Sequence, residues 1–334
     1  MIRLLSGTLI LAALFFTSCF KQDEQITPHP RGNVITDTIP MTENYLYQVY
    51  FNLATGKIIS KNAKTLSDLG FECSQDGWKI ILNTSDFMKA GDLGIVPFGQ
   101  AQDTTGKVMK FDKSDGNPDS LAIGKWYSVN NGDTVSNDHV YVIDRGLDEN
   151  GNHLGFNQVI FDSLKNGSYF FRVAPLKGGQ VINGKATKDP SVNYMFYSFS
   201  SGGSVQQLEP PMNSYDLLFT QYTTMLYTSL GEAYPYLVTG VLLNRYSVAA
   251  KSDTIDSFSS ITLQSVQNMQ LSSNLDGIGY DWKTFNFEAG SYTVRENVVY
   301  IIRDTGGMYY KLRFIGFYNT FGQKGYPIIE CQPL

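Results

Sequence analysis

The fold of this chain is decided by a segment near its C-terminal end with the sequence VVYIIRDTGGMYYKLRFIGF, residues 298–317. Two runs rich in apolar, β-branched and aromatic residues, 298–302 and 309–317, are separated by Thr305-Gly306-Gly307. Val, Ile, Tyr and Phe favour strands, and glycines between two such runs are typical of the turn in an antiparallel hairpin. The segment therefore predicts a β-hairpin that belongs to a larger sheet.

Runs of the same kind recur along the whole chain, each bounded by turn residues. They lie at 45–53, 78–82, 139–143, 168–173 and 237–243. A helical period is supported only over two short segments, 83–89 and 260–271. The sequence therefore predicts an all-β protein, mainly antiparallel, with few short helices.

The chain also contains an internal repeat, because short segments of the first half return in the same order in the second half. The matched segments are 51–56 with 197–202, 68–71 with 216–219, 123–126 with 278–282, 140–144 with 299–304, and 167–169 with 324–326. The offset drifts only between 146 (197 minus 51) and 159 (299 minus 140), as a duplication with small insertions and deletions would produce. We therefore expect two tandem, related β modules, at 45–180 and 190–334, joined near 178–189.

The first eighteen residues have the pattern of a secretory signal peptide, with Arg3 before the apolar run 4–16. This run is short for a helix that crosses about 30 Å of hydrocarbon. The segment Phe16-Thr17-Ser18-Cys19 resembles a bacterial lipobox, with Phe16 in place of the usual Leu, which implies acylation of Cys19. Residues 20–24, with Lys21 before two acidic residues, are similar to the surface-export signal of Bacteroidetes lipoproteins.

These segments together predict a protein held by a lipid anchor in the outer membrane, at the cell surface. Residues 1–18 are the expected lipoprotein signal peptide. Residues 19–44 are expected to form a lipidated, flexible tether, because Pro28, Pro30 and Pro40 lie among polar residues without periodicity.

Composition limits the partners. The net charge of −5 and the isoelectric point near 5.3 argue against nucleic acid or an anionic lipid surface, since either would require a basic face. With 21 Tyr and 21 Phe against 3 His, the composition suits a β-rich binding protein better than a hydrolase. Cys73 and Cys331 lie far apart in sequence, so two separate buried thiols are favoured over one disulfide. The oligomeric state does not follow from the sequence.

Motifs of catalysis and of metal binding are missing from the sequence. It contains no G-x-S-x-G, no H-E-x-x-H and no G-x-x-x-x-G-K. No nucleophile is paired with His139 or His153, which are interpreted as hydrogen-bonded or solvent-facing residues. The segment 148–152 begins like a calcium loop but has His153 at the sixth position and Val159 at the twelfth, so a hairpin turn is favoured. We therefore expect no enzyme and no metal site.

The second module contains a set of recognisable segments: Tyr197-Ser198-Phe199, 215–219, Trp282, 298–303, 310–314 and 322–327. Through these segments it resembles the HmuY family of Bacteroidetes lipoproteins. The resemblance covers 194–334, with a weaker echo over 45–176. The resemblance implies an all-β protein that captures heme at the cell surface and passes it to a TonB-dependent receptor. It also implies that loops supply two axial ligands, His or Met, to the iron.

By this resemblance the ligand-bearing segments correspond to 249–256 and 285–288, and neither contains His or Met. Thioethers are the alternative soft ligands, and the second module contains Met212, Met225, Met269 and Met308. Met269 with Met308 is the substitute pair we consider. Aromatic packing against the porphyrin is expected from Tyr280, Phe285, Phe287 and Tyr292.

Two functions remain open at this point. The first is a surface lipoprotein that binds heme or a related tetrapyrrole and delivers it to an outer-membrane importer. It predicts a cleft lined by aromatic side chains with soft ligands within reach. The second is a non-enzymatic binding or interaction lipoprotein of the same fold whose ligand is a glycan or a protein partner. It predicts an exposed apolar or aromatic patch without convergent ligands.

Overall fold

The computed structural model describes residues 32–130 and 133–334, and the predicted signal peptide 1–18 and the lipidated Cys19 lie outside these residues. Within the described part of the chain, no helix has the length and the apolar content that a bilayer-spanning helix needs. Residues 32–334 form one compact unit by their contacts.

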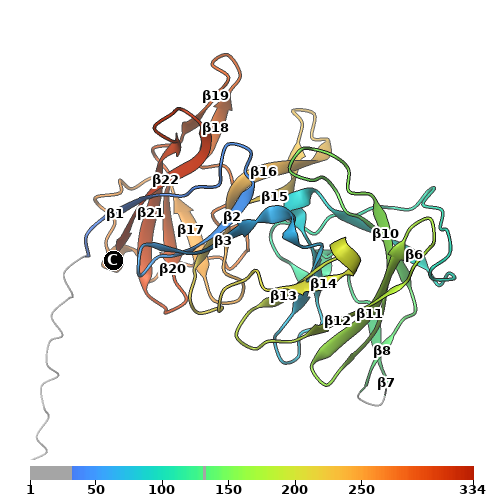
Figure 1. Ribbon diagram of the computed structural model, residues 1–334. Coiled ribbons are helices and arrows are strands. Elements are labelled where there is room, and N and C mark those ends of the chain that lie inside the picture. Colours follow the sequence, from blue (N-terminus) through green and yellow to red (C-terminus); the bar gives the residue numbers. More distant parts are fainter. Residues whose placement is uncertain (1–31, 131–132) are drawn as a thin grey trace, which may run out of the picture. The chain divides into compact units, whose positions relative to one another are not determined.

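The protein is built from antiparallel β-sheets, as the sequence predicts (Figure 1). One sheet contains β1 (Ile35–Thr38), β22 (Lys324–Pro333), β21 (Tyr309–Tyr318), β20 (Val299–Arg303) and β17 (Ala249–Asp253). A second contains β16 (Ala233–Leu243), β15 (Leu217–Tyr227), β2 (Tyr47–Asn52) and β3 (Lys57–Ala63). A hairpin of β18 (Lys283–Asn286) and β19 (Ser291–Val294) projects past β22 in Figure 1.

The remaining two sheets come mostly from the first half of the chain. One contains β12 (Ile182–Thr187), β11 (Ser168–Pro175), β10 (Phe156–Lys165), β8 (Asp133–Ser136), β7 (Tyr127–Asn130), β9 (Val140–Asp144) and β6 (Lys89–Gly94). The other contains β14 (Ser204–Gln206), β13 (Tyr194–Ser198), β4 (Leu69–Glu72) and β5 (Ile80–Leu82).

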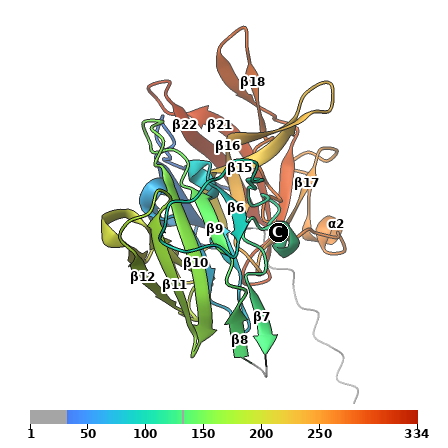
Figure 2. The ribbon, with the colours of Figure 1, turned by 90° about the vertical axis from the view of Figure 1, so that its right-hand side faces the viewer.

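Helical structure is scarce among the described residues. The only α-helix there is the four-residue α2 (Leu263–Val266), capped by Thr262 and drawn beside β17 in Figure 2. Short 3₁₀ turns lie at Lys64–Leu66, Thr84–Asp86, Pro118–Ser120 and Ser200–Gly202. The two helical segments expected from the sequence are therefore reduced to α2 and the turn at Thr84–Asp86.

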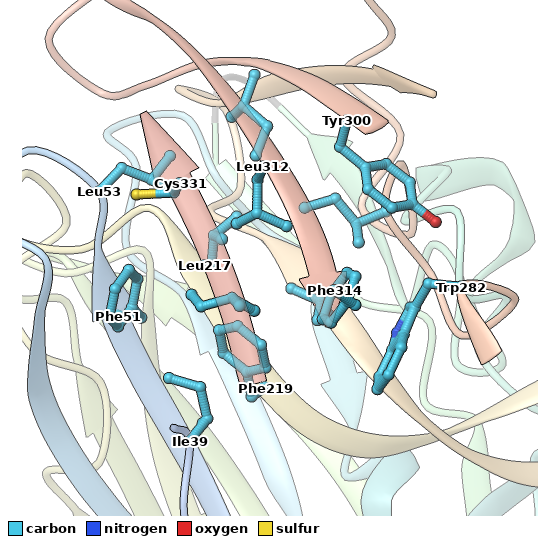
Figure 3. Close-up of a cluster of buried hydrophobic side chains, with 14 of the residues drawn as sticks. Ile39, Phe51, Leu53, Leu217, Phe219, Trp282, Tyr300, Leu312, Phe314 and Cys331 are labelled. Atoms are coloured by element: carbon cyan, nitrogen blue, oxygen red, sulfur yellow. The ribbon is translucent and has the colours of Figure 1, made fainter. Parts of the chain in front are cut away.

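The largest core cluster lies where the β1–β17 sheet meets the β16–β3 sheet. Phe51 and Leu53 from the first half of the chain pack there with Leu217 and Leu312 from its second half (Figure 3). The ring of Trp282 stacks on Phe314 with 3.9 Å between centroids. A second cluster, around Phe71, Trp126 and Phe161, fills the corresponding place in the other pair of sheets.

The two halves of the predicted repeat exchange strands reciprocally. β2 of the first half pairs with β15 of the second, and β13 of the second half pairs with β4 of the first. The registers are equivalent, because Phe51 lies opposite Leu217 and Tyr197 lies opposite Leu69. The boundary near 180–190 thus separates the two repeats in the sequence, whereas hydrogen-bonded strand pairs join them in the structure.

One buried aspartate holds each exchanged strand. The amide of Leu53 donates to Asp216 Oδ2 at 2.7 Å, and the amide of Phe199 donates to Asp68 Oδ2 at 2.6 Å. The amide of each aspartate donates in turn to the exchanged strand, to Phe51 O and to Tyr197 O, both at 2.8 Å. Asp216 and Asp68 therefore occupy the same structural position in the two repeats.

The prediction of a flexible tether over 19–44 is wrong for residues 32–44, the part of this segment that the structure describes. β1 pairs with β22, and the side chains of Ile39 and Met41 are 0% exposed in the main core cluster. The reason is that Ile35, Ile39 and Met41 provide apolar anchors among polar residues, too few to give a periodic signal. Any tether therefore ends before β1.

Cys73 and Cys331 are both free and buried, in agreement with the prediction of separate thiols. Cys331 lies in the main core cluster, whereas Cys73 packs with Val192 and Met195. Burial raises the pKa of the Cys331 thiol to about 11, so it remains protonated and behaves as an apolar side chain.

Candidate functional site

The structure brings together three of the six residues predicted to contact heme. Phe285, Phe287 and Tyr292 form one aromatic cluster on the β18–β19 hairpin, with centroids 5.1 Å and 4.9 Å from Phe285. Phe287 is 89% exposed, whereas Tyr292 packs on the core residue Phe317. The predicted segment 285–288 is thus the tip of an exposed hairpin.

The two methionines considered as iron ligands have different surroundings. Met269 packs, partly buried, against the small core cluster of Phe258, Ile261 and Val266 below β20. Met308 is 58% exposed in the turn between β20 and β21, where the amide of Asp304 donates to its carbonyl oxygen. The pairing of Met269 with Met308 stays a prediction, and neither residue lines a cavity described below.

Tyr280 lines a cavity of about 390 Å³ next to the end of β17. Ser252 and Thr254, from the first segment that the resemblance indicates, line the same cavity. The other lining groups are largely polar: Asp276, Asp281, Arg295, Tyr222 and Tyr300, with the backbone at Gly277 and Gly279. No His, Met or Cys occurs among the described residues of this lining.

This polar cavity suits a porphyrin poorly. A tetrapyrrole needs apolar walls, and its propionates would approach the carboxylates of Asp276 and Asp281. One cation, Arg295, is present, but its Nη1 already lies 3.5 Å from Asp281 Oδ2 and donates to the carbonyl of Asp281. The site at the position implied by the resemblance therefore has the wrong lining for heme.

A larger cleft of about 680 Å³ lies between the segment 109–121 and the β15–β16 hairpin. We call the segment 109–121 the strap. Apolar walls come from both sides: Met109, Phe111 and Leu121 of the strap, and Met225, Tyr227 and Pro235 of the hairpin. Cleft volumes of roughly 300–1,000 Å³ are usual for small-molecule and cofactor sites.

The strap is fixed by a buried carboxylate and a hydroxyl. Asp112, 5% exposed, accepts hydrogen bonds from the amides of Leu82 and Ala122 at 2.7 and 2.8 Å. Burial raises the pKa of Asp112 to about 6. Ser114 Oγ donates to Asp276 Oδ2 at 2.7 Å and lies 3.0 Å from Thr224 Oγ1, so the strap is tied to β15. The strap is therefore held in place beside β15.

The strap contributes two lysine side chains to the lining of the cleft. Lys110 and Lys113 both line it, and both side chains are exposed. In the described part of the chain neither lysine forms an ion pair. Both ammonium groups are therefore available to a carboxylate ligand.

Met225 lines the cleft with a thioether that a ligand can reach. Its side chain is 38% exposed near the end of β15. Met109 is less available, because its sulfur packs over Gly91, within 2.7 Å of where a Cβ on that glycine would lie. Sequence reasoning included Met225 among the soft ligands but missed the strap, because nothing in the strap's pattern indicates that it lies beside β15.

The two remaining imidazoles are hydrogen-bonded, as predicted. His139 Nδ1 lies 2.8 Å from Asp92 Oδ2, and His153 Nε2 lies 2.7 Å from Asp144 Oδ1. The calcium-like segment forms a turn in which Asp148 Oδ1 accepts from the amides of Asn150 and Asn152. Over the residues that the structure covers, no cluster of three or more His, Cys, Asp or Glu could hold a metal ion.

Fold and cleft together define an all-β protein with an amphipathic surface cleft. Comparison with known families then assigns it, because the sequence profile described as HmuY protein matches residues 44–331. The chain belongs to the HmuY family. The match includes the first half of the chain, where the resemblance seen in the residues was weaker. A search of curated protein sequences found no match.

The solved structures that match this chain are distant. Apo PinO from Porphyromonas gingivitis is 11% identical, over 91% of this chain and 98% of that chain, with a TM-score of 0.30. The apo HmuY analog of Tannerella forsythia is 10% identical over 91% and 97%, with a TM-score of 0.26. A proposed HmuY-like heme-binding protein from Bacteroides vulgatus is 16% identical over 52% and 90%, with a TM-score of 0.19. Such low TM-scores support no conclusion about the site.

Proposed function

We propose that this protein is a heme-binding surface lipoprotein that holds heme, or a related tetrapyrrole, in the cleft between the strap and the β15–β16 hairpin. The single observation that supports heme as the ligand is membership of the HmuY family, shown by the match over residues 44–331. The lining of the cleft supports the location, because it combines apolar walls, free cations and a reachable thioether. We infer a binding role rather than a catalytic one.

Each part of a heme would meet a suitable group in this cleft. Phe111 and Tyr227 supply aromatic surface for the porphyrin ring. Lys110 and Lys113, which form no ion pair in the described part of the chain, are available to the two propionates, and Asp115, Asp119 and Asp276 also line the cleft. Met225 would hold the iron through its thioether, a ligand that heme iron accepts and that raises its reduction potential.

Placement at the cell surface rests on the sequence. Acylation of Cys19 would anchor the chain, and the segment between Cys19 and β1 would separate the folded unit from the membrane. From the family resemblance we also propose that heme passes from this protein to a TonB-dependent receptor. An exposed cleft suits such transfer, since the ligand need not cross the core.

The test is a heme titration of residues 22–334 followed by the Soret band in the oxidised and reduced states. We expect saturable binding that Met225→Ala weakens and that changes the spectrum of the reduced complex. Met308→Ala is the matched control, because this exposed methionine lies outside the cleft, and we expect no change. Absence of a Soret shift at micromolar heme would leave the alternative, a lipoprotein that binds a glycan or a protein partner.

A further inference from the structure

The polar cavity of about 390 Å³ is not used by the proposed heme site, yet it has the features of a built binding site. Its floor is made by Tyr222 and Tyr300, each 1% exposed, and its rim by the exposed side chains of Ser252, Thr254 and Arg295. Asp276 separates this cavity from the heme cleft and lines both.

The hydroxyl of Tyr222 is the most informative group in the cavity. It is buried, and among the described residues it has no hydrogen-bond partner. A Cβ built on Gly279, a residue that lines the cavity, would lie 3.6 Å from this oxygen, so the hydroxyl is directed to the cavity wall. A buried hydroxyl without a partner is costly and requires an explanation, and a bound ligand that completes its hydrogen bonding is one.

The lining requires a ligand that both donates and accepts hydrogen bonds. The carboxylates of Asp276 and Asp281 only accept, the guanidinium of Arg295 only donates, and the hydroxyls of Tyr222, Ser252 and Thr254 do both. An anionic ligand would face two carboxylates with one shared cation. A purely apolar ligand would leave these groups unpaired.

We propose that this cavity binds a neutral, hydroxyl-rich ligand, a saccharide unit. The hydroxyls of the saccharide would form hydrogen bonds with Asp281, Arg295 and the Tyr222 hydroxyl. Its C–H face would pack on the ring of Tyr280, a half-buried side chain of the cavity lining. This site is distinct from the heme cleft and does not depend on heme binding.

The experiment is saturation-transfer difference NMR on residues 22–334 with D-glucose, D-galactose, D-mannose and N-acetyl-D-glucosamine at millimolar concentration. We expect saturable binding of at least one sugar, weakened about tenfold in Tyr222→Phe, as expected for one lost hydrogen bond to a buried group. Arg295→Gln is a second variant at the exposed rim and should also weaken binding. Tyr141→Phe changes a buried tyrosine outside the cavity and should leave binding unchanged.

Several results would overturn the proposal. They are the absence of any signal from all four sugars, binding that neither Tyr222→Phe nor Arg295→Gln weakens, or binding of choline in place of the sugars. The Soret titration of the same variants separates this proposal from the heme site, because we expect it to be unchanged. Loss of heme binding in Tyr222→Phe would show that the cavity, not the cleft, takes heme.

Discussion

At the scale of single residues, Asp216 and Asp68 explain why the two exchanged strands stay in place. Asp216 is 0% exposed, and besides the amide of Leu53 it accepts from the amide and the hydroxyl of Thr305 at 3.0 and 2.9 Å. Asp68 is bound by the guanidinium of Arg145, with Nε 2.6 Å from Oδ1. Each carboxylate thus joins segments that are more than a hundred residues apart in sequence.

Replacing Asp216 by Asn should destabilise the protein markedly. The amide retains one acceptor oxygen but puts an NH₂ group against backbone donors, so at least one buried amide loses its partner. An unsatisfied buried group costs about 1–3 kcal/mol, and we expect a loss of that size in urea unfolding. Asp256→Asn, at an exposed position, is the control and should change the free energy of unfolding by less than about 0.5 kcal/mol. Equal stability of both variants would contradict the clamp role of Asp216.

Lys283 should make stability depend on pH. Burial lowers the pKa of its ammonium group from 10.5 to about 7, and its Nζ lies 4.2 Å from the centre of the Trp282 ring. Above pH 7 the folded state releases this proton while the unfolded state still binds it, so stability from this group rises with pH between about 7 and 10.5.

The measurement is the free energy of unfolding from pH 7 to 9, compared between the wild type and Lys283→Met. We expect the wild type to gain stability over this window relative to the variant, by at most about 1.4 kcal/mol per pH unit. Other titrating groups are shared by the two proteins, so their contributions cancel in the comparison. Parallel curves for the two proteins would show that Lys283 keeps its ordinary pKa.

At the scale of elements, the sequence predicted the strands with strong patterns and missed those without. The runs at 298–302 and 309–317 became β20 and β21, joined at the predicted glycine turn. The sequence predicts a tether where β1 lies, because only the contacts of this segment with β22 and the core make it a strand. A segment with alternating polar residues can be identified as a strand only when its partner strand is known. The partner of β1 lies nearly 300 residues away in the sequence.

β1 and the residues after it should contribute to stability although they were expected to be flexible. Met41 is 0% exposed, and truncating it leaves a cavity, so Met41→Ala should cost about 2–5 kcal/mol. The same substitution at Met308, 58% exposed, should cost less than about 0.5 kcal/mol. Thermal and urea unfolding of both variants provide the comparison, and equal stability would restore the tether interpretation for this segment.

For the whole molecule, the sequence predicts an internal repeat but not the exchange of strands between its halves. Short matches such as Asp68-Leu69 with Asp216-Leu217 reveal a duplication, but sequence order does not say which copy pairs with which. The site was missed for the same reason. The strap and β15 are about a hundred residues apart, and only the fold brings Lys113 and Met225 to one cleft.

The exchange predicts that neither half folds alone. A fragment of residues 190–334 would leave β15 without β2 and β13 without β4. We expect it to give poorly dispersed amide NMR signals, and to fold when mixed with residues 32–189. A well-dispersed spectrum of the isolated fragment would contradict the mutual dependence of the two halves.

We place heme in the cleft between the strap and the β15–β16 hairpin, and methyl NMR of ¹³C-labelled methionines can locate the iron. Ferric heme is paramagnetic, so it shifts and broadens the signals of methyl groups close to the iron. We expect the Met225 signal to be affected most, followed by that of Met109, while those of Met269 and Met308 stay unchanged. Selective perturbation of the Met269 and Met308 signals would contradict this placement and would support the ligand pair that the sequence suggests.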